Sequence, residues 1–194
     1  MIAYVSGKLV EKNPSYAIIE ANGIGYFLHI SLQTFSAMKN EEFCKLHTYL
    51  SIKEDAHTLY GFADIPEREL FKQLISVSGV GTNTARMMLS SMNSNEIISA
   101  IVTENVNALK SIKGIGAKTA QRVILDLKDK VGKDMVSQGN AFVGNSAIKE
   151  EALSALLVLG FDKKATEKTI EGILIKNPEI KDVEELIKLS LKKL

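Results

Sequence analysis

Cysteine, tryptophan and proline are scarce in this sequence, and their scarcity excludes several classes of site. The 194 residues include one cysteine, no tryptophan and three prolines. Because Cys44 is alone, neither an internal disulfide nor a thiolate metal cluster can form, which is typical of a reducing compartment. The three histidines, His29, His47 and His57, share no metal-ligand spacing. We therefore expect no metal and no cofactor.

Long apolar runs and a strong net charge are also missing. No stretch approaches membrane-spanning length, and residues 1–8 lack the apolar core of a secretory signal, so we expect a cytoplasmic protein without membrane association. The net charge is +1, so the chain as a whole is no polycation. Lys and Arg outnumber Asp and Glu only in residues 64–133, by 10 to 7. This local excess favours the middle segment as one that contacts a nucleic-acid backbone.

One short pattern occurs twice in that middle segment. Residues 74–81 (LISVSGVG) and 109–116 (LKSIKGIG) each end in Gly-apolar-Gly, 35 residues apart. Glycine permits a tight turn and close backbone approach, and each copy leads into an amphipathic run with helical spacing. Free amides at such a helix start suit a phosphate without reading any base. One copy alone could be an ordinary helix–helix turn, but the repetition favours a tandem helix-hairpin-helix element.

The first 63 residues carry the composition of short β-strands. Turn signals at Asn13-Pro14-Ser15 and Asn22-Gly23 separate runs rich in Ile, Val, Tyr, Phe and Leu. The expected strands cover residues 2–10, 16–21, 25–30, 45–52 and 58–62. This spacing predicts a small OB-type barrel, with a short helix at residues 31–39.

An acidic loop connects the last two of these expected strands. Glu54 and Asp55 are adjacent there, which is unusual in a protein that contacts DNA. Two interpretations stay open at this point. The loop is either a solvated hairpin tip or an acidic projection that repels phosphates and holds DNA strands apart.

Helical patterns begin at residue 64 and continue to the end of the chain. Asp64 and Asn93 each have a glutamate three residues later, which is a helix-start signal, and a shorter helix is expected at residues 105–111. We expect about five helices in a domain of residues 64–133. The polar residues 134–146 are expected to be a flexible linker.

Residues 147–194 are expected to form a compact three-helix domain. Gly160 is a natural helix stop, and Asp182 begins the last helix. Three short helices bury little surface, so part of the leucine-rich face could bind a protein partner, with Leu156, Leu159 and Ile173 as candidates. The alternative, that these side chains are internal core, stays open. The fold class is therefore α+β with several domains.

Enzyme interpretations are tested against the same residues. Ala117-Lys118-Thr119 resembles the end of a phosphate-binding P-loop, but glycines are missing at positions 112 and 117 and a helix precedes it, so no ATP site is expected. A hairpin-type DNA glycosylase needs a catalytic Asp in a Gly/Pro-rich segment, whereas Asp126 lies inside a regular helical pattern. We expect no catalytic residue. A subunit that only binds other proteins is the third alternative.

Taken together, these features resemble the RuvA family, bacterial subunits that bind four-way Holliday junctions during branch migration. The likeness covers essentially the whole chain. Its most specific parts are residues 54–62 (EDAHTLYGF) and 114–122 (GIGAKTAQR). The resemblance implies an OB-like barrel, a tandem helix-hairpin-helix domain and a UBA-like three-helix bundle. It also implies a role in DNA recombination and in repair of damaged DNA during the SOS response, without catalysis by this subunit.

The resemblance further implies the partners. Proteins of this family assemble as homotetramers on an open, square-planar junction, and one tetramer or two face-to-face tetramers are both compatible with the sequence. The last domain would contact RuvB, a hexameric ATPase that pulls DNA through the complex. The resolvase RuvC is a further implied partner.

Site residues carry over position by position. Glu54 and Asp55 would form an acidic pin at the crossover. Lys118 and Arg122 match basic positions and would contact phosphates. At the first hairpin Thr82-Asn83-Thr84 replaces the usual basic residue, so Asn83 would bond phosphate and Arg86 could supply the missing charge. Backbone amides would come from Gly79, Val80, Gly81, Gly114, Ile115 and Gly116.

Overall fold

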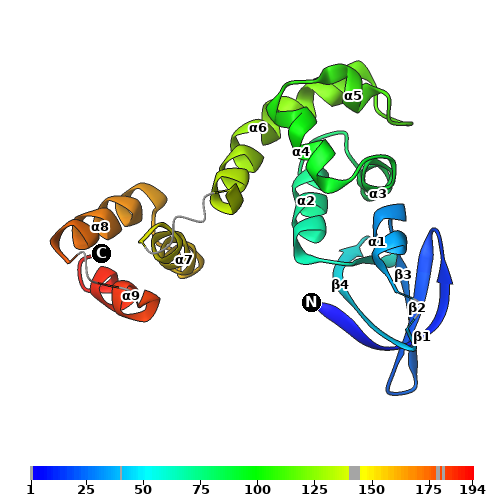
Figure 1. Cartoon of the computed structure of the whole chain (residues 1–194), viewed down its shortest axis with the longest axis horizontal. Coiled ribbons are helices and arrows are strands. Elements are labelled where there is room, and N and C mark those ends of the chain that lie inside the picture. Colours follow the sequence, from blue (N-terminus) through cyan, green and yellow to red (C-terminus); the bar gives the residue numbers. More distant parts are fainter. Residues whose placement is uncertain (1, 40, 140–144, 178–179, 181) are drawn as a thin grey trace. The chain divides into compact units, whose positions relative to one another are not determined.

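A computed structural model describes the chain except residues 1, 40, 140–144, 178–179 and 181. Strands come first and helices follow, apart from one short helix inside the β region (Figure 1). The strands are β1 (Tyr4–Asn13), β2 (Tyr16–Ala21), β3 (Ile24–His29), β4 (Phe43–Ile52) and β5 (His57–Phe62). The helices are α1 (Leu32–Ala37), α2 (Ile65–Ile75), α3 (Thr82–Ser91), α4 (Ser94–Val102), α5 (Val106–Lys110), α6 (Ala117–Gly139), α7 (Asn145–Val158), α8 (Lys163–Lys176) and α9 (Val183–Leu191).

The five strands close into a barrel in the order β1-β2-β3-β5-β4, which confirms the predicted OB-like fold. Neighbouring strands are antiparallel, except for a parallel contact between β3 and β5. The Asn22-Gly23 pair forms the predicted tight hairpin, since both residues have positive φ, 51° and 79°. Gly7 is required where β1 meets β2, because a Cβ there would lie 2.0 Å from the carbonyl oxygen of Glu20.

Alternating residues fill the barrel. Val5, Ala17, Ile19, Leu28 and Leu46 are all buried, and their strand neighbours face outward. Helix α1 packs Phe35 against the barrel core and lies between the barrel and the helical region (Figure 1). Its N-cap, Ser31, accepts a hydrogen bond from the Thr34 amide at 2.9 Å.

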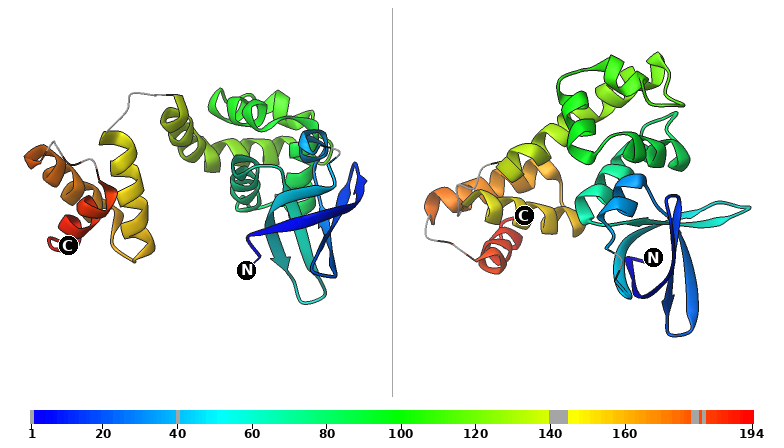
Figure 2. Two further views of the ribbon diagram at one scale, coloured as in Figure 1. Left: turned by 60° about the horizontal axis from the view of Figure 1, so that its bottom comes forward. Right: turned by 45° about the vertical axis from the view of Figure 1, so that its right-hand side comes forward.

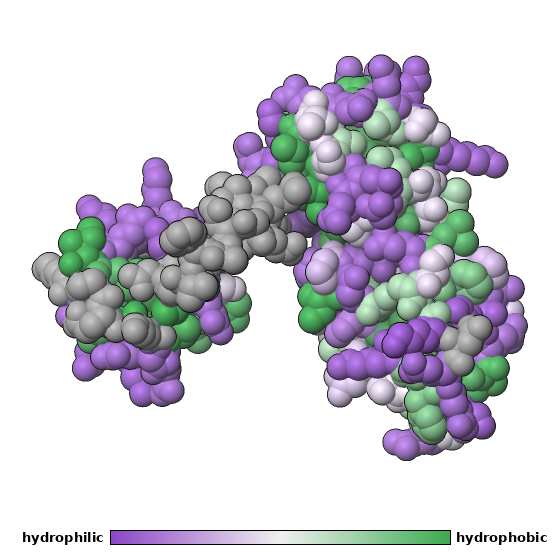
Figure 3. All heavy atoms as spheres, viewed as in Figure 1, coloured by the Kyte–Doolittle hydropathy of each residue, from purple (hydrophilic) through white to green (hydrophobic). Residues whose placement is uncertain are grey.

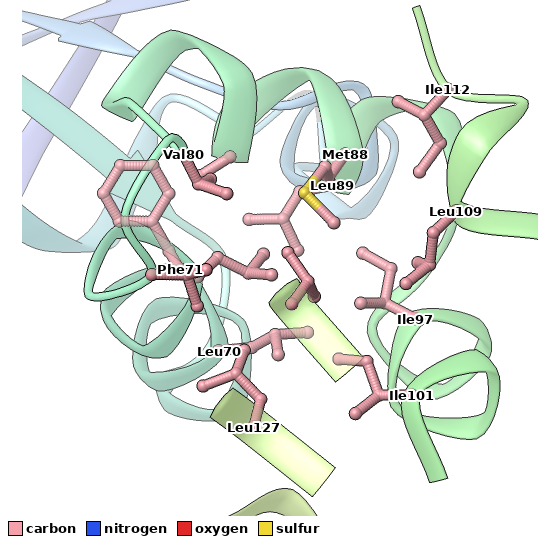
Figure 4. Packing of buried hydrophobic residues seen from close by; sticks show 14 of the residues in the cluster. Leu70, Phe71, Val80, Met88, Leu89, Ile97, Ile101, Leu109, Ile112 and Leu127 are labelled. Atoms are coloured by element: carbon pink, nitrogen blue, oxygen red, sulfur yellow. The ribbon is translucent and has the colours of Figure 1, made fainter. Parts of the chain in front are cut away.

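Helices α2 to α5 and the first part of α6 surround a second core. Figure 4 shows Val80 from the repeated stretch 74–81 and Ile112 from the stretch 109–116 directed into this core together with Met88 and Leu89. The predicted caps at Asp64 and Asn93 are present, and the second is a complete capping box with Glu96. The apolar positions of the repeat therefore hold the two hairpins to one helical body.

The barrel and this helical region share their core. Phe71 of α2 is fully buried, and its ring packs against Tyr60 and Phe62 of β5 with centroid distances of 5.2 and 4.9 Å. Residues 1–133 accordingly form one compact unit. The acidic loop directly precedes β5, and β5 packs against α2, so the loop is connected to the helical region that contains the hairpins.

Residues 134–194 form the second compact unit, and three of its helices, α7, α8 and α9, pack around a small core. The predicted helix stop at Gly160 is present, with φ of 95°. Of the predicted linker, residues 134–139 belong to α6 and residues 145–146 to α7, while residues 140–144 lie outside the described residues. The predicted division at 134 and 147 remains a prediction.

Candidate nucleic-acid interface

The first Gly-apolar-Gly stretch is a tight corner between α2 and α3. The Val77 amide donates to the Leu74 carbonyl at 3.1 Å, and the Val80 amide donates to the Val77 carbonyl at 3.0 Å. Helix α3 then begins, with the Ala85 amide bonded to the Gly81 carbonyl at 2.9 Å. The corner is therefore built by its own backbone.

The second stretch, between α5 and α6, repeats this geometry bond for bond. The Ile112 amide donates to the Leu109 carbonyl at 3.2 Å and the Ile115 amide to the Ile112 carbonyl at 3.1 Å. The Ala120 amide bonds the Gly116 carbonyl at 2.9 Å. The structure thus contains two copies of one corner, as the 35-residue repeat predicts.

The glycines are exposed at both corners and fall into two kinds. Gly79 and Gly114 have φ of 93° and 91°, a conformation that favours glycine. Gly81 and Gly116 do not have positive φ, and a Cβ at either would meet nothing within 4 Å. The fold therefore does not require glycine at these two positions. They leave an open backbone that another molecule can approach closely.

Val80 and Ile115 differ from the prediction. Their amides, expected to bind phosphate, are used inside the corners, and their side chains are buried in the core. The amides of Gly79, Gly81, Gly114 and Gly116 stay predicted donors, and further donors follow them in the chain. The amides of Thr82 and Asn83 at the start of α3, like those of Ala117 and Lys118 at the start of α6, precede the first intrahelical bond.

Helix α3 has no side-chain cap. Its N-cap is Gly81, whereas Asp64, Asn93 and Asn105 cap α2, α4 and α5 with side-chain oxygens. A capping side chain would occupy the amides that an anion needs. The absence of a cap at the corner that carries a predicted phosphate site is consistent with an external acceptor there.

The two corners lie next to each other. Arg122 of α6 reaches the first corner, where its Nη1 donates to the Ser78 Oγ at 3.2 Å and to the Ser78 carbonyl at 3.4 Å. A hollow between them is lined by Ser78, Gly79, Lys118, Thr119, Gln121 and Arg122. The hollow thus combines one corner with the basic first turns of the helix that follows the other. Sequence reasoning missed Ser78, because nothing in the local pattern identifies its partner 44 residues away.

The surface around the second corner is hydrophilic. Lys118 and Arg122 are exposed beside the second corner, and Asn83 is exposed at the first corner. Figure 3 shows hydrophilic residues along the outer edge of the helical region near α5, with apolar residues between them. A polar surface with cations and unpaired amides suits the backbone of DNA.

Arg86, the candidate for the missing charge at the first corner, contacts the barrel. Its Nη1 donates to the Ser15 carbonyl at 3.0 Å and to the Ile30 carbonyl at 3.5 Å, both in the barrel region. Its Nε is buried without a partner among the described residues. Burial, with a contribution from the Arg86 charge, lowers the pKa of His29. Arg86 therefore connects α3 to the barrel instead of extending into solvent.

The acidic loop is the tip of the β4–β5 hairpin. The Lys53 amide donates to the Ala56 carbonyl at 2.9 Å and closes the loop, leaving Glu54 and Asp55 exposed. Figure 2 shows this hairpin extending from the barrel. The structure therefore presents the two carboxylates on a projection.

The candidate partner residues of the second unit separate into two groups. Leu156 and Ile173 are buried in the core of this unit, so the prediction that they contact a partner is wrong for this conformation. Leu159 is 61% exposed. The helical periodicity of leucines could not distinguish the inner from the outer face.

The catalytic candidate of the glycosylase alternative has no distinctive setting in the structure. Asp126, the catalytic candidate of the glycosylase alternative, is an exposed residue within the regular helix α6. Within the described residues, no group of three or more His, Cys, Asp or Glu side chains is placed to hold a metal ion. None of the helices searched in those residues has the length and apolarity to cross a bilayer.

Family models match three successive parts of the chain. The RuvA N-terminal domain matches residues 1–61, the SAM-like helix-hairpin-helix tandem matches residues 71–129, and the RuvA C-terminal domain matches residues 147–194. The three matches follow the order of the barrel, the corners and the three-helix unit.

Full-length relatives carry one common name, Holliday junction branch migration complex subunit RuvA. The protein of Christiangramia forsetii is 56% identical over 195 residues, covering all of both chains. That of Cytophaga hutchinsonii is 50% identical over 99% of both chains, and that of Bacteroides thetaiotaomicron is 50% identical over all of both chains.

Proposed function

Because this chain belongs to the RuvA family, we propose that it binds four-way DNA junctions and brings them to a branch-migration motor. The observation that carries the proposal is the pair of matched glycine corners on one helical body. Their open amides and the cations beside them suit two neighbouring points on a DNA backbone. The subunit itself binds and positions DNA, and the ATPase RuvB supplies the chemical energy.

The phosphate contacts come from both corners. At the second corner, the amides at the start of α6 act with Lys118 and Arg122 in charge-assisted hydrogen bonds. At the first corner, Asn83 and the uncapped amides of α3 bind without a full charge, because Arg86 is engaged with the barrel. The second corner is thus the stronger electrostatic contact. Gly79, Gly81, Gly114 and Gly116 permit the DNA backbone to approach.

Glu54 and Asp55 act as a pin at the crossover. Their carboxylates repel phosphates, and this repulsion increases where a junction centre is partly desolvated. Corners alone would grip the backbone of any duplex. The pin therefore supplies the preference for the open centre of a junction.

Self-association into a homotetramer follows from the same proposal. The barrel exposes several large apolar side chains, which contacts between copies of the chain would cover. They are Tyr4, Val10, Ile24, Phe27, Phe43 and Ile52, each at least 47% exposed. Four copies would place four pins at the centre of a four-way junction, either in one tetramer or in two face-to-face tetramers.

The second unit recruits RuvB. The proposed linker is residues 134–146, of which residues 134–139 and 145–146 are helical. Its exposed apolar side chains support this role, since Leu159 and Val158 are 61% and 85% exposed. The resolvase RuvC is a further proposed partner of the assembled complex. Cytoplasmic localisation is part of the same proposal.

The proposal is tested by the mass of the complex with a synthetic four-way junction. We expect four or eight copies of the chain per junction, and binding that persists in the presence of excess duplex with the same arm sequences. One copy per junction, or equal competition by duplex, would contradict the proposal. Cleavage of damaged-base duplex by the purified protein would favour the glycosylase alternative instead.

A further inference from the structure

A buried carboxylate lies between the barrel and the helices of the corners. Glu67 of α2 is 0% exposed. Its Oε1 accepts from the Ser31 Oγ at 2.5 Å, and its Oε2 accepts from the Thr34 Oγ1 at 2.7 Å and from the Ala63 amide at 3.3 Å. No lysine, arginine or histidine of the described residues forms an ion pair with it. The carboxylate therefore depends on these three donors.

All three donors belong to the barrel side. Ser31 and Thr34 are at the start of α1, and Ala63 follows the end of β5. A buried charge without a cation is costly unless hydrogen bonds compensate its desolvation. Since these bonds form only when α1 and α2 are correctly aligned, the carboxylate favours one arrangement of the barrel against the helices.

Other polar contacts cross the same boundary. The Leu32 amide donates to the Ser90 Oγ at 3.1 Å, and the Ser94 amide donates to the Gln33 Oε1 at 3.0 Å. These bonds connect α1 to α3 and to the start of α4. Helix α1 is therefore hydrogen-bonded to α2, α3 and the start of α4. The bonds to α2 are those of the buried Glu67 carboxylate.

A similar contact leads from the acidic loop to the first corner. The Tyr60 hydroxyl donates to the Thr82 Oγ1 at 2.9 Å. Tyr60 belongs to β5, the strand that leaves the acidic loop, and Thr82 is the first residue of α3. The loop and the corner are thus joined through a short series of ordered residues.

We propose that Glu67 is a positioning residue, which through Ser31 and Thr34 fixes the acidic loop relative to the glycine corners. The consequence for DNA rests on the proposed function. Corners that bind the backbone act on any duplex, whereas the pin acts only at a crossover. If the contact between α1 and α2 were loose, the corners could hold a duplex while the pin moved away from its position relative to them. The preference for junctions therefore depends on this alignment.

The alignment is tested first without DNA. Spin labels at Ala56→Cys and Met87→Cys, in a Cys44→Ser background, report the distance between the acidic loop and α3. Thr34→Val removes the hydroxyl at nearly constant volume, whereas Thr34→Ser keeps it. Glu69→Gln is the matched control, because Glu69 lies on the same helix but bonds Arg68 and Lys72 on the surface.

We expect Thr34→Val to broaden the distance distribution, while Thr34→Ser and Glu69→Gln keep the wild-type distribution. Unchanged distances in Thr34→Val, even with lower thermal stability, would overturn the proposal and leave Glu67 a merely structural residue. If Thr34→Val does not fold, Glu67→Gln replaces it, because an amide cannot accept from all three donors.

The consequence for DNA is tested by the ratio of affinities for a four-way junction and for a duplex. Thr34→Val should lower this ratio about ten-fold, the effect of losing one hydrogen bond to a charged group. Adding Glu54→Gln and Asp55→Asn should then cause little further loss. A wild-type ratio in a variant with broadened distances would refute the link to specificity. A wild-type protein without junction preference would instead contradict the proposed function, and the label distances would still decide the role of Glu67.

Discussion

At the scale of single residues, Lys118 and Arg122 contribute differently to the proposed contact. Lys118 is exposed in the first turn of α6, next to the free amides. Arg122 lies one turn later and already bonds Ser78 of the other corner. Arg122 can therefore hold the two corners together while offering its remaining donors to a phosphate.

Replacing both cations should weaken binding to every duplex arm. Each lysine or arginine that neutralises a phosphate releases counterions, so Lys118→Ala with Arg122→Ala should reduce the slope of log K against log salt by about one to two per subunit. Fluorescence anisotropy over a salt series measures this slope. Lys130→Ala, an exposed cation further along α6, is the control, and an unchanged slope in the double variant would contradict these contacts.

Glu67 should give the protein a specific pH dependence. Burial raises the pKa of this carboxyl, bonds from Ser31 and Thr34 lower it in part, and Asp64 raises it further. The folded protein therefore binds this proton more tightly than the unfolded chain does. Its contribution to stability is highest below the ordinary value of 4.5 and decreases as the pH rises toward the raised pKa.

Chemical unfolding at several pH values tests this sign. Relative to Glu67→Gln, the wild-type free energy of unfolding should decrease as the pH rises through that window. Glu69 is a control of opposite sign: burial raises its pKa, but bonds from Lys72 and Arg68 leave it below the ordinary value. Relative to Glu69→Gln, the wild type should gain stability as the pH rises. A difference between wild type and Glu67→Gln that is independent of pH would contradict the prediction.

Residue roles that depend on distant partners could not be predicted from the sequence. Asp64 and Glu67 together indicated a helix start, and the Asp64 cap is present, but the Glu67 carboxylate bonds α1 of the barrel. The sequence shows that Arg86 lies one turn after the first corner, but not that its guanidinium donates to a carbonyl of the barrel region. In both cases the partner is a residue of the barrel that no local pattern specifies.

At the scale of elements, the glycines of the first corner are of two kinds: one is required by the backbone conformation, and the other is not. Gly79 has a positive φ, so an alanine there would be strained by about 1 to 2 kcal/mol. Gly81 does not have a positive φ, and a methyl group added to its Cα would meet no atom within 4 Å. The proposed approach of a DNA backbone would account for glycine at this second position.

We expect Gly79→Ala to lower the free energy of unfolding by about 1 to 2 kcal/mol. Gly81→Ala should leave stability almost unchanged and still weaken DNA binding, because the methyl group would meet the phosphate backbone. Thermal unfolding and anisotropy on the same samples separate the two effects. Normal DNA binding by a stable Gly81→Ala variant would show that the first corner does not approach DNA closely.

Elements were predicted well where their signals are local. The barrel strands follow from alternating apolar residues, the hairpin from Asn22-Gly23, and the two corners from the repeated glycines. The end of α6 was not predicted, since the apolar periodicity fades before Gly139 while the helix continues. Where the apolar periodicity of a sequence fades, the end of a helix has no clear signal in the sequence.

At the scale of the whole molecule, the chain consists of residues 1–133, the proposed DNA-binding unit, and a smaller unit with its own core. Deleting residues 147–194 should therefore spare junction binding and abolish stimulation of RuvB. Junction gel shifts and ATP-driven branch migration measure the two activities. Branch migration at the wild-type rate by the shortened protein would contradict this division of roles.

The most direct measurement of the central claim is the affinity of the wild-type protein for a four-way junction and for a duplex of the same arm sequence, each at several salt concentrations. We predict tighter binding to the junction at every salt concentration, with a steep loss of both affinities as salt increases. Equal affinities for the two DNAs, or affinities that do not change with salt, would contradict the account.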